Sequence, residues 1–247
     1  MILLLAAVAI VVGFFIGAVG VGGILLIPPL VWLGGLSIHE AAASALLSFL
    51  ATGMLGTWLF QRRGSIDWKM AAPICIGAIA FSYLGAMVNS IVEARQLALI
   101  IAIIIIFAGA YILLPSRRIG ERPRDGRGAA QQALLLSVGA VAGFGAGFSG
   151  AGGPLFSVPI MLLLRFVPLA TIGASQVLQI VVSISGTIGN LQYGSVNFVV
   201  VGWITLFELI GVAIGTRAAH AVSPAVLRRM AASLCIALGL VMLTQSL

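Results

Sequence analysis

Hydrophobic residues in this chain form ten runs separated by short polar or glycine-containing segments. The runs lie near 2–19, 23–34, 40–60, 70–90 and 96–114, and then near 132–149, 153–164, 168–190, 198–219 and 225–246. A helix needs about 20 apolar residues to cross ~30 Å of hydrocarbon. Most runs approach that length, so the pattern predicts an all-α integral membrane protein. The second run of each half is too short to cross and predicts a half-helix.

The second half of the chain repeats the glycine pattern of the first at an offset of 130 residues. The stretch 13–29, GFFIGAVGVGGILLIPP, returns at 143–159 as GFGAGFSGAGGPLFSVP. The offset holds further along, where Gly64-Ser65 matches Gly194-Ser195. An internal duplication in an apolar chain is typical of secondary transporters. We therefore expect two transmembrane repeats of about five segments each, over 1–114 and 131–247, joined by a linker over 115–130.

The composition agrees with a membrane protein and excludes several other classes. Hydrophobic residues make up 61% of the chain and charged residues 8%, whereas soluble domains carry about 25% charged residues. The net charge is +7, but the basic residues lie between apolar runs rather than on one face, which argues against nucleic acid as a partner. Cys75 and Cys235 fall inside apolar runs, so we expect buried thiols and no metal site, disulfide framework or cofactor.

The distribution of positive charge predicts how the two halves are oriented. If the halves are inverted, every Lys and Arg except Arg95 lies on one side of the membrane, including the five arginines between 117 and 127. Parallel halves would move Arg165, Arg217, Arg228 and Arg229 to the other side. The positive-inside rule therefore favours inverted repeats with the basic linker in the cytoplasm and both termini outside.

Each half contains a glycine cluster that predicts a break in the helix. Glycine loses helical order easily and allows a ligand to approach the backbone. The short segment after each break would begin with unpaired amides and a partial positive charge, which favour an anion. Inverted symmetry would bring the two breaks together at one central anion site. The candidate residues there are Gly20, Gly22, Gly23, Ser149, Gly150, Gly152 and Gly153.

Helix packing is the alternative explanation for some of these glycines. Gly13 with Gly17, and Gly143 with Gly147, form GxxxG motifs, for which we favour close helix contacts. The segment 145–150 also matches a dinucleotide fingerprint literally. No strand is expected before it and the pattern is absent from the first repeat, so we reject a nucleotide site.

Polar residues in the third run of each half are further candidates for the anion site. Hydroxyl and amide donors bind an oxyanion without the cost of burying a cation. The candidates are Ser44, Ser48, Ser175, Gln176 and Gln179. Serines can also bond their own helix backbone, so for them packing stays an open alternative.

Glu208 is the one carboxylate well inside an apolar run, and its repeat equivalent is Ala78. Intramembrane carboxylates point to ion or proton pathways. Proton coupling and a neutral structural acid both stay open for Glu208.

The duplicated pattern G-F-x-x-G-x-x-G-x-G-G followed by a proline resembles that of the sulfite exporter TauE/SafE family of bacterial membrane proteins. The later turns Gly-Ser-Ile-Asp (64–67) and Gly-Ser-Val-Asn (194–197) are similar too. The resemblance covers essentially the whole chain. It implies a carrier of small sulfur-containing anions, such as sulfite or an organosulfonate, in the bacterial cytoplasmic membrane. Alternating access of two inverted repeats would move the anion.

Two other function classes compete with a sulfur-anion carrier. The glycine tips would serve equally as the filter of a small-anion channel, and a carrier of small carboxylates would need the same donors. A membrane enzyme is disfavoured because no catalytic constellation is evident; the two histidines, His39 and His220, lie near segment ends. The expected partners are the anion and the lipid bilayer, with protons and a second copy of the chain left open.

Overall fold

The computed structural model describes residues 2–20, 22–113, 128–164 and 166–221, with isolated residues between 229 and 244. Within these ranges the chain is helical and contains no strand. Predictions that concern most of the linker 115–130, Arg165, Arg228 and most of the run 225–246 fall outside the described residues.

The described helices follow the apolar runs closely. The first half contains α1 (Ile2–Val19), the 3-10 helix η1 (Gly23–Leu26), α2 (Ile27–Trp32), α3 (Ile38–Arg62), α4 (Trp68–Ile91) and α5 (Ala94–Leu113). The second contains α6 (Ala129–Ser149), α7 (Pro154–Leu163), α8 (Pro168–Tyr193) and α9 (Phe198–Ala221). Among the described residues, α3, α4, α6, α8 and α9 are long and apolar enough to cross a membrane. The prediction of an all-α membrane protein is confirmed.

Short polar turns determine where the long helices begin. The Ser37 side chain accepts a hydrogen bond from the amide of Glu40 at 3.2 Å and caps α3. The Asp67 side chain accepts from the amide of Lys69 at 2.9 Å and caps α4. Such caps supply partners for amides that the first helical turn leaves free. With α4 at 68–91 and α9 at 198–221, the helix bounds recur at the offset found in the sequence.

Two hydrophobic cores hold the helices together, and each includes the fourth helix of the other half of the chain. The first, called here the α1–α9 core, draws most of its buried residues from α1, η1, α2, α3, α5 and α9. The second, the α4–α6 core, draws most of its residues from α4, α6, α7 and α8. The fourth helices of the two repeats, α4 and α9, are thus exchanged between the halves.

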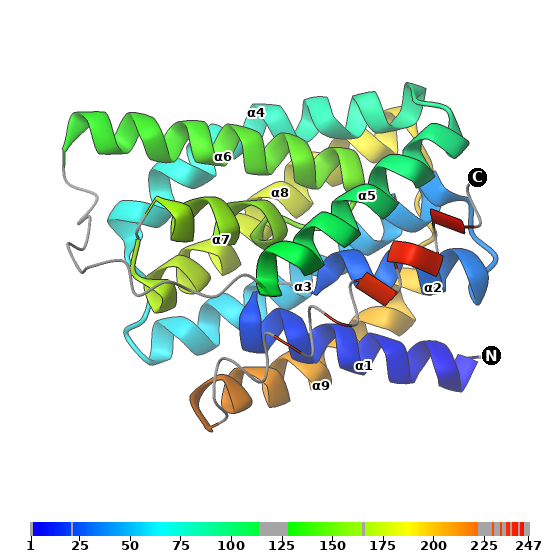
Figure 1. The fold of residues 1–247 in the computed structure, drawn as a ribbon, viewed down its shortest axis with the longest axis horizontal. Coiled ribbons are helices and arrows are strands. Elements are labelled where there is room, and N and C mark those ends of the chain that lie inside the picture. Colours follow the sequence, from blue (N-terminus) through cyan, green and yellow to red (C-terminus); the bar gives the residue numbers. More distant parts are fainter. Residues whose placement is uncertain are drawn as a thin grey trace.

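The helix contacts follow the same exchange. α1 packs along α9, and its repeat equivalent α6 packs along α4. Figure 1 shows these two pairs at opposite edges of the molecule, with α3 and α8 between them. α3 contacts α9, and α8 contacts α4 in the corresponding way.

The central helices α3 and α8 run antiparallel where they cross. Gly53 in α3 lies against Ile180 in α8. Leu46, earlier in α3, lies against Gly186, later in α8. Because α3 and α8 are repeat equivalents, this crossing gives the two third helices opposite directions.

The glycines of the two GxxxG motifs lie at helix crossings. The contacts are Gly13 with Glu208, Gly17 with Val212, Gly143 with Ala78 and Gly147 with Ser82. Residue numbers rise together on both helices of each pair, so α1 runs parallel to α9 and α6 runs parallel to α4. Without a β-carbon, the two backbones approach closely and gain dispersion contacts that lipid cannot replace.

A methyl group added at one of these crossings is expected to destabilise the fold. A β-carbon on Gly17 would lie 2.5 Å from the carbonyl oxygen of Val212 and 2.9 Å from the amide nitrogen of Thr216. We expect Gly17→Ala to lower the free energy of unfolding in detergent by about 1–3 kcal/mol. Gly202→Ala is the matched control, since no atom lies within 4 Å of a β-carbon there. Equal stability of the two variants would contradict the tight α1–α9 crossing.

Candidate substrate site at the two glycine breaks

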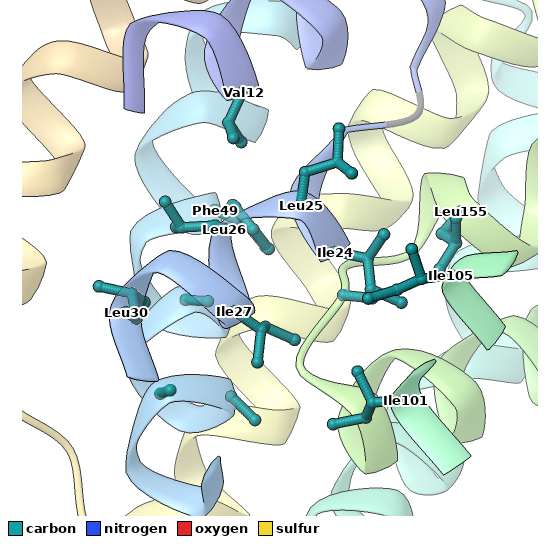
Figure 2. Close-up of a cluster of buried hydrophobic side chains, with 14 of the residues drawn as sticks. Val12, Ile24, Leu25, Leu26, Ile27, Leu30, Phe49, Ile101, Ile105 and Leu155 are labelled. Carbon is teal, nitrogen blue, oxygen red and sulfur yellow. The ribbon is translucent and has the colours of Figure 1, made fainter. Parts of the chain in front are cut away.

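The first break folds the chain back against α1. Gly20 has a φ of +75°, in the left-handed region that glycine adopts most easily. A β-carbon on Gly22 would lie 2.9 Å from the carbonyl oxygen of Val12, so the chain returns directly along α1. The segment that follows is wholly buried and apolar, and Figure 2 shows Ile24, Leu25, Leu26 and other side chains of this cluster packed around it.

The second break also contains glycines in the left-handed conformation, and a serine side chain adds hydrogen bonds to it. Gly150 and Gly152 have φ values of +69° and +80°. The Ser149 hydroxyl donates to the carbonyl of Gly145 at 2.6 Å and accepts from the amide of Ala151 at 3.3 Å. The serine therefore ties the end of α6 to the break, before α7 begins at Pro154.

The two breaks meet beside the middle of α3 and α8. A β-carbon on Gly23 would lie 2.6 Å from the carbonyl oxygen of Ala151 and 2.7 Å from the ring of Phe49. A β-carbon on Gly152 would lie 3.2 Å from the same ring and 3.6 Å from Oε1 of Gln179. Phe49 therefore contacts the breaks of both halves, and the structure brings together the glycines predicted to meet.

Phe49 and Gln179 occupy equivalent positions in the two repeats. Nε2 of Gln179 donates to the carbonyl of Phe49 at 3.4 Å. The helices α3 and α8 thus meet, beside the two breaks, at positions that are equivalent in the sequence repeat.

The predicted glutamines lie at this centre. Gln179 donates to Oγ1 of Thr52 at 2.9 Å. Gln176 donates to the carbonyl of Ile16 at 3.3 Å, while its Oε1 atom is buried against Gly56 without a partner. The two amides connect α8 with α3 and with α1.

The predicted serines lie around the centre in different roles. Ser175 shares a hydrogen bond of 2.8 Å with Ser157 of α7. Ser48 donates to the carbonyl of Ala45 in its own helix at 2.8 Å. Ser44 accepts from the amide of Asn197 at 3.0 Å and so contacts the turn before α9 rather than the breaks.

The site is closed in this structure. The side-chain donors of Ser48, Ser149, Gln176 and Gln179 each bond a protein acceptor. Two apolar surface pockets lie elsewhere, one between α1 and α9 and one between α4 and α8, and no predicted site residue lines either of them. An anion could reach these donors only after the helices separate.

Two residues at the centre were absent from the sequence-based candidates. Phe49 could have been found from the repeat offset, because it is the equivalent of Gln179. Ser157 lies one helical turn after Gly153, where a hydroxyl reaches the neighbouring helix; its hydroxyl also bonds the Gly153 carbonyl at 3.1 Å.

Comparison with known proteins identifies the family. The family described as "Sulfite exporter TauE/SafE" matches residues 5–242. The chain belongs to this family. No solved structure matches the chain.

Curated relatives of this TauE/SafE protein are named as transporters. The probable membrane transporter protein YdhB of Bacillus subtilis is 23% identical over 92% of this chain and 94% of its own length. The probable membrane transporter protein MJ0441 of Methanocaldococcus jannaschii is 25% identical over 98% and 96%. This TauE/SafE protein is therefore a multi-pass membrane transporter and not an enzyme.

The hydrogen bond between Gln179 and Thr52 should be measurable as a coupling energy in the TauE/SafE protein. We expect Thr52→Val and Gln179→Leu to be non-additive, with a coupling of about 0.5–1.5 kcal/mol in the free energy of unfolding. Thr57→Val with Gln179→Leu is the control pair, since no hydrogen bond joins Thr57 to Gln179. Additive effects at Thr52 would contradict the closed arrangement of α3 and α8.

Proposed function

We propose that this protein is a secondary transporter, acting as an exporter, of a small sulfur-containing anion such as sulfite or an organosulfonate. The observation that carries the proposal is the meeting of two glycine breaks at the centre of a TauE/SafE-family fold. Each break begins a short helix, and the amides at the start of a helix lack intrahelical acceptors. In these two helices Pro154 has no amide hydrogen, and the amides of Leu25 and Phe156 bond the carbonyls of Gly22 and Gly153, so the amides before them remain for an anion. Two such N-termini close together favour an anion over a cation or a neutral solute.

The donors around the breaks suit an oxyanion. Ser149, Gln176 and Gln179 offer hydroxyl and amide hydrogens, and no Lys or Arg belongs to the described centre. Neutral donors hold an anion strongly enough to select it and weakly enough to release it, because no buried ion pair has to be broken. This balance suits a carrier.

Opposite orientation of the two repeats supports alternating access. The antiparallel crossing of α3 with α8 and the exchanged pairs α1–α9 and α4–α6 are what two inverted halves would give. In our proposal the α1–α9 core and the α4–α6 core rock against each other about the crossing of α3 and α8. The rocking breaks the protein hydrogen bonds of Gln176 and Gln179 and frees these donors for the anion on one side at a time.

Counterflow in proteoliposomes tests the proposal. Labelled sulfite outside should exchange with unlabelled sulfite inside, with saturation and with competition by sulfoacetate but not by acetate. Gly152→Leu should reduce the exchange at least tenfold, because the left-handed backbone there disfavours any β-carbon and the side chain would enter the site. Gly202→Leu, which faces open space, should leave it unchanged.

Three results would change the conclusion. Flux that fails to saturate and shows no trans-stimulation would favour a channel. Saturable exchange of acetate alone would favour a carrier of carboxylates. Absence of flux with every sulfur anion would contradict the substrate while leaving the family intact.

Labelling of equivalent turns tests the orientation in the cytoplasmic membrane. Ser65 and Ser195 lie in the matching turns before α4 and α9. In a variant without native cysteines, we expect Ser65→Cys to react with an impermeant thiol reagent only from the cytoplasmic side and Ser195→Cys only from outside. Labelling of both from the same side would overturn the inverted repeats, and Ser65→Cys labelling from outside would overturn the placement of the basic linker in the cytoplasm.

A further inference from the structure

Glu208 is the buried ionisable group that the proposed anion site does not use. It lies within α9, with a fully buried side chain, against the crossing of α9 with α1 at Gly13. The Ser48 hydroxyl of α3 lies near the carboxyl group but makes no hydrogen bond with it. That hydroxyl donates its hydrogen to the carbonyl of Ala45, so both carboxyl oxygens remain without a hydrogen-bond partner.

No cation of the described helices faces this carboxyl group. α1 contains no titratable residue, and those of α3 are His39, Glu40 and Arg62 near its ends. Arg63, directly after α3, donates to the carbonyl of Thr216 at 3.0 Å, more than two helical turns along α9 from Glu208. On α9 itself, Arg217 and His220 lie more than two helical turns away. A carboxylate buried in such surroundings would have neither a counter-ion nor a donor, which is the costliest state of an acidic side chain.

We propose that Glu208 is a proton-binding site, and that α9 closes on α1 and α3 only when this carboxyl group carries a proton. The neutral acid carries no charge that needs a counter-ion, so it can stay buried between α9, α1 and α3. Loss of the proton leaves an uncompensated charge that water must reach, and α9 then separates from α3. The ligand of this site is H⁺ itself, and its occupancy governs closure of the transporter.

The helix α3 connects the proton site with the anion site. Ser48 and Thr52 lie one helical turn apart on α3, so they share a face. Ser48 meets Glu208 of α9, and Thr52 accepts the hydrogen bond of Gln179 on α8. Movement of α9 away from α3 therefore changes the packing of α3, the helix whose Thr52 accepts the hydrogen bond of Gln179.

Infrared spectroscopy tests the proton directly and does not depend on the proposed function. At neutral pH the protein in lipid should show the carbonyl stretch of a neutral carboxylic acid. That band should disappear in Glu208→Gln and persist in the matched control Glu93→Gln, which alters an exposed carboxylate. Absence of the band from the unaltered protein would overturn the proposal, whether or not the variant folds.

A transport assay tests the effect on closure, and this arm rests on the proposed function. The probe is exchange of labelled sulfoacetate at equal pH inside and outside, because its charge does not change between about pH 6 and pH 9. Exchange should fall as pH rises, approaching tenfold per pH unit once Glu208 is mostly ionised. Glu208→Gln should exchange at a rate independent of pH, while Glu208→Asp and Glu93→Gln should keep the dependence.

The outcomes separate the two proposals. A Glu208→Gln protein that is slower at every pH but keeps the dependence of the unaltered protein would overturn the proton site. A neutral-acid band without exchange of any sulfur anion would support the proton site and contradict the proposed substrate.

Discussion

Every peptide group within a bilayer must find its hydrogen-bond partner inside the protein, because hydrocarbon offers none. This constraint explains why the two interruptions of helical structure lie where they do. Both breaks are buried at the middle of the molecule, enclosed by α3, α8 and the two cores. A break placed on a lipid-facing surface would leave its amides unpaired, so a duplicated glycine motif can persist only at the contact between the halves.

The two breaks share a glycine pattern but differ in their surroundings. Around the first, the short segment is embedded in aliphatic side chains and the equivalent of Gln179 is Phe49. Around the second, Ser149, Ser157 and Gln179 provide hydrogen bonds. The fourth helices differ in the same way, since the position equivalent to Glu208 is Ala78. The first break therefore contributes apolar packing to the centre, and the second break contributes hydrogen-bonding side chains.

The sequence was sufficient for the elements and for the glycine contacts, because hydropathy and the repeat offset are local signals. The bounds of α4 and α9 differ by the offset observed between the glycine clusters, and GxxxG spacing predicted the crossings of α1 and α6. The partners were not predictable in this way. Ser44 contacts the turn at Asn197 rather than the breaks, and Gln176 bonds a carbonyl of α1. Such contacts depend on which helices pack together once α4 and α9 are exchanged. The sequence pattern of a single helix does not predict its packing partners.

The exchange of α4 and α9 separates the order of synthesis from the order of packing. α1 is the first described helix to be made, yet its long neighbour α9 is the last of the described long helices. Such long-range contacts raise the contact order and delay assembly. α6, by contrast, finds α4 already in the membrane. The nascent protein therefore holds a nearly complete α4–α6 core while α1 still exposes a glycine face to lipid, so α1 is made before the other described helices and is among the last of them to be packed.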